Sequence, residues 1–120
     1  MQVVIERLLD AISHMHDHGI SHRDLKLENL VLARPGDLAS VTIVDFGLAK
    51  AARARQQMKG VVGTTHYCAP EILLASPYTP VVDSWSLGVV MYMLLTGALP
   101  PKLAFASSIH FVCDTLIHTK

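Results

Sequence analysis

The stretch from residue 29 to residue 45, "NLVLARPGDLASVTIVD", predicts the element around which the fold is organised. Residues 30–33 and 41–44 are apolar and partly β-branched, as in short strands, and the Pro-Gly-Asp sequence between them is typical of a turn. An antiparallel hairpin brings its two outer flanks to the end opposite the turn, about 5 Å apart. We therefore expect Asn29 and Asp45 to lie side by side.

The residue types at this end predict a metal site. Mg²⁺ prefers one or two protein oxygens, completed by water and by substrate phosphates. Asn29 and Asp45 supply such a pair, so the pattern indicates a nucleotide-bound metal. Asp24 lies on the irregular segment that leads to Asn29. A carboxylate beside the metal can orient a hydroxyl group and accept its proton.

Two helices are expected on either side of the hairpin sequence. In residues 2–18 apolar side chains recur at three- and four-residue steps, which predicts an amphipathic helix that Gly19 ends. Residues 82–95 are apolar on nearly every face, and Asp83 is well placed to begin this second helix. Such a helix belongs at the centre of a domain.

The segment between the hairpin and the second helix shows little regular pattern. Residues 48–68 have no clear period and are expected to form an extended surface loop. A short helical turn is expected around residues 72–74, and the pattern of residues 102–120 is compatible with one more amphipathic helix. The predicted fold is mainly α, with a small β-hairpin.

Composition excludes several classes of function. The chain has 120 residues, of which 51% are apolar, and its 10 basic and 10 acidic side chains cancel, which argues against a nucleic-acid partner. The most apolar run, 85–95, is too short to span a membrane. Cys68 and Cys113 form no CxxC pattern, so a reducing location is expected: the cytoplasm, with the nucleus as an alternative.

Four short motifs follow one another along the chain: "HRDLKLEN" at 22–29, "DFG" at 45–47, "APE" at 69–71 and "DSWSLG" at 83–88. In this order they resemble the C-terminal lobe of a eukaryotic Ser/Thr protein kinase. The local sequences "DFGLAK" and "LLTGALP" are most similar to those of the calmodulin-dependent kinase group. The resemblance implies a partial kinase-like α+β fold at residues 1–101, followed by a divergent tail at 102–120.

The resemblance also implies an activity, the transfer of phosphate from ATP to a protein Ser or Thr with Mg²⁺ as cofactor. By this resemblance residues 22–29 are the catalytic loop, with Asp24 as the base and Lys26 as a neutraliser of the transferring phosphate. Asn29 and Asp45 are the second and the principal metal ligands. Thr64 is expected to hydrogen-bond near Asp24 and to seat the acceptor hydroxyl.

Other residues receive structural roles from the same resemblance. His22 and Phe46 belong to a stacked apolar column that joins the two lobes, and Gly47 completes the "DFG" motif. Asp83 is expected to hold the backbone of the catalytic loop. Glu71 of "APE" pairs with a later Arg in the family, yet no Arg follows Arg55 here. A buried Glu71 without its partner is destabilising.

Regulation and substrate choice rest on two further residues. Arg23 before Asp24 is typical of kinases whose activation segment, here residues 45–71, is tuned by phosphorylation. No Ser, Thr or Tyr lies between residues 48 and 63, so we expect no switch at the usual position. Glu28 resembles the carboxylate with which basophilic kinases bind a substrate Arg; a solvent-exposed loop acid is the alternative.

Two histidines offer a different interpretation of the same region. His14 and His18 are spaced to share one helix face and to grip zinc, but they lack an adjacent third ligand of the HExxH type. We expect them to be solvated side chains.

Several parts of a kinase domain are not found in the sequence. The glycine-rich loop, the strand Lys and the helix Glu belong upstream of residue 1 in the family's order. We therefore expect the N-terminal lobe to be absent and the 120-residue chain alone to have no measurable turnover. The competing function is a non-catalytic interaction module, whose exposed apolar surface is covered by a partner.

Overall fold

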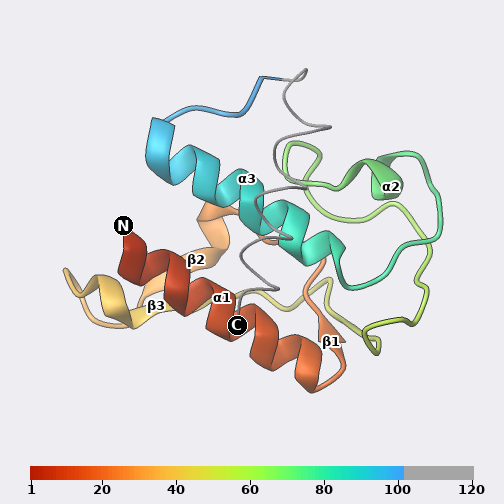
Figure 1. The fold of residues 1–120 in the computed structure, drawn as a ribbon, viewed down its shortest axis with the longest axis horizontal. Coiled ribbons are helices and arrows are strands. Elements are labelled where there is room, and N and C mark those ends of the chain that lie inside the picture. Colours follow the sequence, from red (N-terminus) through yellow and green to blue (C-terminus); the bar gives the residue numbers. More distant parts are fainter. Residues whose placement is uncertain (102–120) are drawn as a thin grey trace.

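The computed structural model describes residues 1–101 (Figure 1). Their regular elements, in chain order, are α1 (Gln2–Asp17), β1 (Ile20–Ser21), β2 (Leu30–Leu32), β3 (Val41–Ile43), β4 (Lys50–Ala51), α2 (Pro70–Leu73) and α3 (Val82–Thr96). The helix considered for residues 102–120 lies outside the described part. Within residues 1–101, every helix is too short or too polar to cross a membrane.

Helix α1 forms where the apolar period predicts it. Val4, Leu8, Ile12 and Met15 are its buried residues, spaced at three- and four-residue steps along one face. The helix ends at Asp17, and Gly19 turns the chain in the left-handed conformation at φ +68°. The predicted helix is confirmed, with an end one residue earlier.

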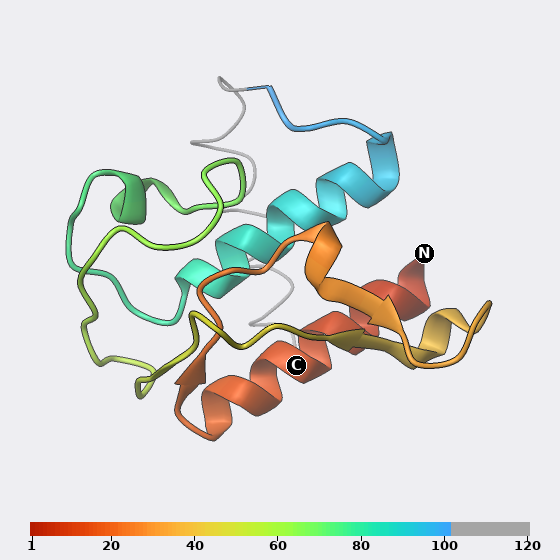
Figure 2. The same ribbon diagram turned by 180° about the vertical axis from the view of Figure 1, so that it is seen from behind.

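Helix α3 is the central element of the fold. Ten consecutive residues, 82–91, are buried, and α3 runs beside α1 in the opposite direction (Figures 1 and 2). The expectation that Asp83 begins the helix was wrong, because Val81 occupies the N-cap and its side chain makes no cap bond. Asp83 lies in the first turn instead, and its carboxylate is used in tertiary contacts.

Strands β2 and β3 form the predicted antiparallel hairpin. Leu30 pairs with Ile43 and Leu32 with Val41, so each strand is one residue shorter than expected. Beyond the last pair, the Val44 amide donates to the Asn29 carbonyl oxygen at 2.9 Å. Asn29 therefore lies opposite Val44, next to Asp45. The hairpin brings the two flanking residues to one end, as predicted.

The expectation of a surface loop at 48–68 was partly wrong. Strand β4 pairs with β1, and Met58 forms an isolated bridge with Tyr78 and is only 1% exposed. Two-residue strands and one buried Met leave no periodic trace in a sequence, because periodicity needs several turns or alternations. Both contacts fix the loop to the body of the domain.

Candidate active site

The carboxylate of Asp24 is held by two side chains. The Thr64 hydroxyl donates to Asp24 Oδ1 at 2.8 Å, and Lys26 Nζ lies 3.4 Å from Asp24 Oδ2. Lys26 Nζ also donates to Thr64 Oγ1 at 3.1 Å, which closes a triangle of contacts. The Asp24 side chain is 11% exposed. One carboxylate, one hydroxyl and one ammonium group therefore converge at a partly buried point.

Glycine at position 63 permits this convergence. Its φ is +96°, and a Cβ there would lie 2.6 Å from the backbone oxygen of Arg23. Only a residue without a side chain lets the activation segment approach the catalytic loop this closely. The next residue, Thr64, then reaches Asp24, although the two are 40 positions apart in the chain.

The predicted metal-ligand pair, Asn29 and Asp45, lies at the open end of the hairpin. Asn29 is buried, and its amide nitrogen donates to the backbone oxygen of Asp24 at 2.8 Å. Because the nitrogen is engaged there, the amide oxygen is the atom suited to a metal. Asp45 is exposed, with its backbone in the left-handed region at φ +62°. Strained backbone of this kind is concentrated at functional sites.

The donor set at this end fits Mg²⁺. It consists of one amide oxygen and one carboxylate. Mg²⁺ prefers hard oxygen ligands and usually takes only one or two from the protein, completed by phosphate oxygens and water. Gly47 helps to orient the Asp45 carboxylate, because its amide donates to Asp45 Oδ1 at 3.2 Å. A Cβ at Gly47 would lie 3.1 Å from that oxygen. Residues 1–101 contain no group of three His, Cys, Asp or Glu side chains that could hold a metal alone.

His22 links the catalytic loop to the hairpin. The Asp24 amide donates to His22 Nδ1 at 3.2 Å, so the ring proton is assigned to Nε2, which donates to the Val44 carbonyl oxygen at 3.2 Å. The imidazole also meets Phe46 edge to face, at a centroid distance of 5.0 Å. Despite this contact, 49% of the Phe46 surface is exposed to solvent. The two rings are thus in contact, while their part in a column that joins two lobes stays a prediction.

Asp83 organises the start of the catalytic loop from α3. Its carboxylate is completely buried and accepts the backbone amides of His22 at 2.9 Å and Arg23 at 2.8 Å. It also accepts the Ser21 hydroxyl at 3.0 Å and lies 2.9 Å from Nε2 of His16. The expected contact with the loop backbone is observed.

Sequence reasoning missed His16 and Ser21 as partners of Asp83. A signal for His16 was available, because it follows Ile12 by four positions and so extends the buried face of α1. A polar residue on an apolar face indicates a buried hydrogen-bond partner.

The geometry can be compared with known proteins. The family model of the protein kinase domain matches residues 1–114 of this chain. The chain belongs to the protein kinase family.

Relatives with high sequence identity to the chain are Ser/Thr kinases. The chain is 48% identical over 96 residues to the human calcium/calmodulin-dependent protein kinase type IV, a match that covers 80% of this chain and 20% of the relative. It is 46% identical over 99 residues to the human serine/threonine-protein kinase H1, covering 81% and 23%. The predicted resemblance to Ser/Thr kinases of the calmodulin-dependent group is confirmed. The chain spans about a fifth to a quarter of these relatives' length.

In this kinase chain Arg23 contacts neutral groups. Its Nε donates to the Leu48 carbonyl oxygen at 2.8 Å, and its Nη1 donates to the Tyr78 hydroxyl at 3.2 Å. The Tyr78 hydroxyl in turn donates to the Gly60 carbonyl oxygen at 3.0 Å. The activation segment is thus attached to the catalytic loop through uncharged partners. The absence of a phosphorylation switch stays a prediction.

Glu28 lies at the edge of the candidate site. It is exposed, and the Tyr67 hydroxyl approaches its Oε2 at 3.5 Å. Burial raises the pKa of Tyr67, and the negative charge of Glu28 raises it further. Glu28 is therefore exposed to solvent with the Tyr67 hydroxyl beside it. This position is compatible with a carboxylate that binds a substrate Arg and equally with a solvent-exposed loop acid.

Glu71 is half-buried and joins none of the ion pairs in residues 1–101. Cys68 lies in the same segment and is buried, with its thiol 3.3 Å from the Val62 carbonyl oxygen. Burial raises the pKa of the Cys68 thiol, and the charge of Asp24 adds to this effect. Cys68 is therefore a buried thiol of low reactivity rather than a nucleophile.

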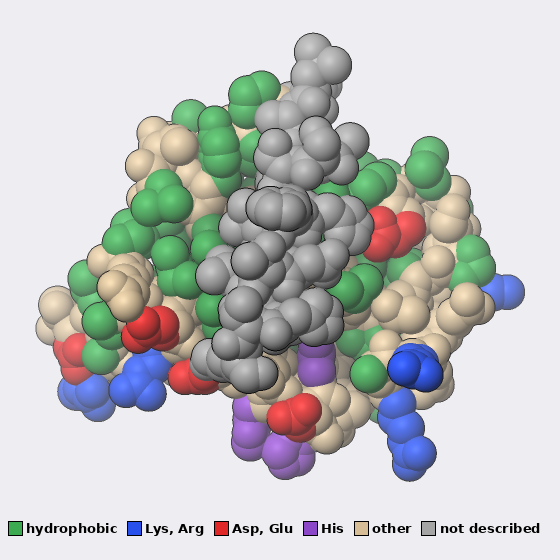
Figure 3. All heavy atoms as spheres, viewed as in Figure 1, with side chains coloured by type: hydrophobic (Ala, Val, Ile, Leu, Met, Phe, Trp, Pro, Cys, Tyr) green, Lys and Arg blue, Asp and Glu red, His purple; other side chains and the backbone are tan. Residues whose placement is uncertain are grey.

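His14 in α1 and His18 directly after it are exposed and lie outside the site. The rings of His14 and His18 are 4.2 Å apart between centroids, and His18 Nδ1 donates to the His14 carbonyl oxygen at 2.7 Å. Histidine side chains gather at one edge of the face shown in Figure 3. Both residues are exposed, as the sequence predicts.

Proposed function

We propose that residues 1–101 form the catalytic lobe of a protein Ser/Thr kinase, corresponding to the C-terminal lobe of the family. The observation that carries this proposal is the closed triangle of Asp24, Thr64 and Lys26 beside the hairpin end that bears Asn29 and Asp45. A proton acceptor, a positioning hydroxyl and a cation lie together beside two metal-ligating oxygens.

Each side chain has a task that follows from its contacts. Asp24 accepts the proton of the substrate hydroxyl, and the Thr64 hydrogen bond fixes the direction of its carboxylate. Lys26 brings a positive charge to the point where phosphate charge develops. Asn29 and Asp45 are the residues that would hold Mg²⁺. The transferred phosphoryl group would come from ATP, and Mg²⁺ held there would neutralise its charge.

The nucleotide-covering parts are not among these 120 residues, which contain no glycine-rich loop followed by a strand Lys. We therefore expect a polypeptide of these residues to transfer no measurable phosphate. A transfer assay with radiolabelled ATP on the purified chain tests this expectation. Turnover that Asp45→Asn abolishes would show that it is wrong.

The catalytic proposal is tested by an exchange of segments. Residues 1–101 replace the matching segment of the human calcium/calmodulin-dependent protein kinase type IV, and transfer to a Ser/Thr peptide is measured. We expect transfer, and we expect Asp24→Asn in the exchanged segment to slow it about 10²–10⁴-fold. A chimera that unfolds cooperatively and binds ATP, yet transfers no phosphate, contradicts the proposal.

A second candidate function is the binding of a protein partner. Large apolar side chains are exposed, among them Leu74 at 76% and Phe46 at 49%, and apolar side chains spread over the face that carries α1 and α3 (Figure 3). Such a module would compete with a complete kinase for its protein partners. In a transfer assay of the human type IV relative on a protein substrate, excess 120-residue chain should then lower the rate; an unchanged rate contradicts this function.

A further inference from the structure

Two imidazole rings lie against each other at the C-terminal end of α1. His14 belongs to the last turn of the helix, and His18 is the residue directly after it. The ring centroids are 4.2 Å apart, and the ring planes are inclined at 41°. Both residues are exposed. Side chains four positions apart lie on one helix face, so the two rings form a pair that ions can approach from solvent.

A hydrogen bond determines which nitrogen of His18 is available. Its Nδ1 lies 2.7 Å from the His14 carbonyl oxygen. A carbonyl oxygen only accepts, so in the neutral ring the proton is assigned to Nδ1 and the lone pair to Nε2. Histidines that bind metals almost always donate their other ring N–H to a backbone carbonyl, a carboxylate or water. The His18 ring is therefore held in the tautomer in which Nε2 can bind a metal.

We propose that His14 and His18 together bind a divalent transition metal, and Zn²⁺ is the ion to which the proposal commits. Zn²⁺ lies about 2.0–2.1 Å from an imidazole nitrogen, so one tetrahedral ion shared by two rings places their centroids about 5 Å apart. The two centroids are 4.2 Å apart, so a small rotation about the side-chain bonds admits the ion. Water completes the coordination, because residues 1–101 contain no group of three side chains that could hold a metal.

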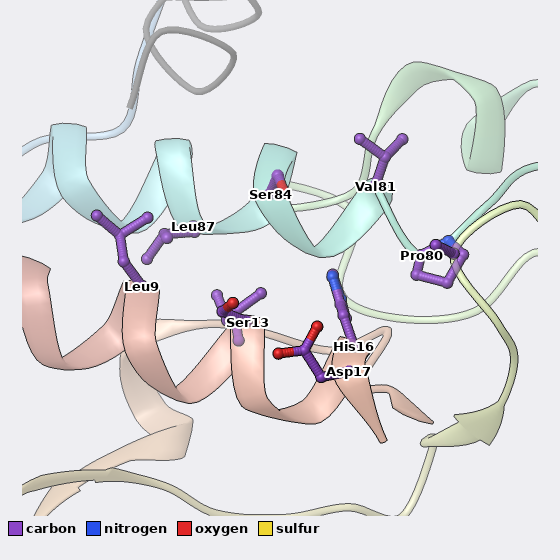
Figure 4. Close-up of a pocket in the computed structure, with 10 residues that line it drawn as sticks. Leu9, Ser13, His16, Asp17, Pro80, Val81, Ser84 and Leu87 are labelled. Atoms are coloured by element: carbon purple, nitrogen blue, oxygen red, sulfur yellow. The ribbon is translucent and has the colours of Figure 1, made fainter. Parts of the chain in front are cut away.

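The third histidine of α1 is not a ligand of this ion. His16 extends from α1 toward α3 (Figure 4), and its Nε2 lies 2.9 Å from Asp83 Oδ2. Residues two positions apart on a helix do not face each other, so the His16 ring lies away from the pair. The site is therefore an open one, in which two imidazoles bridge a single helical turn.

The charge around the pair favours a cation. The last carbonyl groups of α1 form the negative end of the helix dipole, which stabilises positive charge within the last turn. Asp17 is exposed in the same turn, beside the pocket between α1 and α3 (Figure 4). Asp10 is exposed one helical turn before His14. An acidic side chain lies beside the histidine side chains in Figure 3.

The ligand type separates this site from the one at the end of the hairpin. Imidazole nitrogens suit Zn²⁺, Ni²⁺ and Cu²⁺, whereas carboxylate and amide oxygens suit Mg²⁺ and Mn²⁺. Mn²⁺ also stands lowest in the usual order of affinities for nitrogen ligands. Zn²⁺ is therefore expected at His14 and His18, and Mn²⁺ at Asn29 and Asp45. The inference goes beyond the proposed function and does not depend on it.

The test is a titration of Zn²⁺ into the 15N-labelled 120-residue chain, followed by long-range 1H–15N spectra of the imidazole rings. We expect Nε2 of His18 and one ring nitrogen of His14 to shift together and to saturate at one ion per chain. His14→Gln and His18→Gln should each weaken this binding about tenfold or more. His66→Gln, the same change at an exposed residue of the activation segment, should leave the affinity unchanged.

A second measurement uses stability. The ion binds the pair only where the helix brings the two rings together, so Zn²⁺ should raise the urea midpoint of the wild-type chain and of His66→Gln, but not that of His18→Gln. Zinc shifts at other histidines and not at this pair overturn the proposal. So does an affinity that neither His14→Gln nor His18→Gln changes, and so does saturation at one ion per two chains, which means that a second copy supplies the ligands.

Discussion

Gly63→Ala tests how the activation segment is seated on the catalytic loop. At φ +96° an alanine is in the left-handed region, and its Cβ would lie 2.6 Å from the Arg23 backbone oxygen and 3.2 Å from Cys68 Sγ. The Arg23 carbonyl belongs to the same peptide unit as the Asp24 amide, which donates to His22 Nδ1 at 3.2 Å, so the carbonyl cannot move away without disturbing this contact. The substitution therefore combines backbone strain with a collision.

The magnitude follows from these two effects. Left-handed backbone costs an alanine about 1–2 kcal/mol, and an unaccommodated methyl group in a packed region costs about 1–3 kcal/mol. We expect Gly63→Ala to lower the free energy of unfolding by about 2–5 kcal/mol, a large part of the roughly 5–15 kcal/mol typical of a domain. Gly60→Ala is the matched control, because Gly60 has φ +104° with no atom within 4 Å of its Cβ position.

Urea unfolding followed by tryptophan fluorescence measures both variants. Trp85 is the one tryptophan of the chain and is 6% exposed, so its emission reports the exposure of the core. Equal m-values allow the two midpoints to be compared as stabilities. The reasoning predicts that Gly63→Ala is less stable than Gly60→Ala by about 1–3 kcal/mol. A difference below about 0.5 kcal/mol refutes the collision.

Three further predictions concern neighbouring groups. Thr64→Val should be about 1–3 kcal/mol less stable than Thr64→Ser in the same unfolding assay, because it leaves Asp24 without its hydroxyl donor; equal stabilities contradict this. Tyr78→Phe should lower the unfolding free energy by about 1 kcal/mol through its lost hydroxyl contacts, while Tyr92→Phe should not; equal losses count against the contacts. Because burial raises the pKa of Cys68, the folded state favours the thiol, so stability is full below the pKa of the unfolded thiol and falls as pH rises above it. Alkylation of the Cys68 peptide at pH 8, followed by mass spectrometry, should be slower in the folded chain than in urea; equal rates contradict the burial.

The sequence predicts those elements whose pattern extends over several residues. Helix α1 repeats its apolar period over 16 residues, and the two hairpin runs enclose a turn with Pro and Gly. Strands β1 and β4 contain two residues each, too few for an alternation, and they pair residues that are far apart in the chain, Ile20 with Ala51 and Ser21 with Lys50. Their existence depends on tertiary packing, which no local pattern reports.

The candidate site likewise has contacts that the residues alone predict and contacts that they do not. Hairpin register alone predicts that Asn29 and Asp45 meet, because antiparallel pairing fixes which residues face each other. The contact of Thr64 with Asp24 spans 40 positions and came only from the resemblance to kinases. Asp83 shows the limit of local rules: a typical helix-starting residue is used instead to hold a distant loop.

Binding of Mn²⁺, with and without ATP, tests the central claim most directly, because this paramagnetic ion broadens the NMR signals of nearby nuclei. The claim is that Asn29 and Asp45 form a divalent-metal site at the open end of the hairpin, beside Asp24. In the 15N-labelled chain, broadening should centre on these three residues and should be lost in Asp45→Asn. Broadening centred on His14 and His18, or unaffected by Asp45→Asn, contradicts the account.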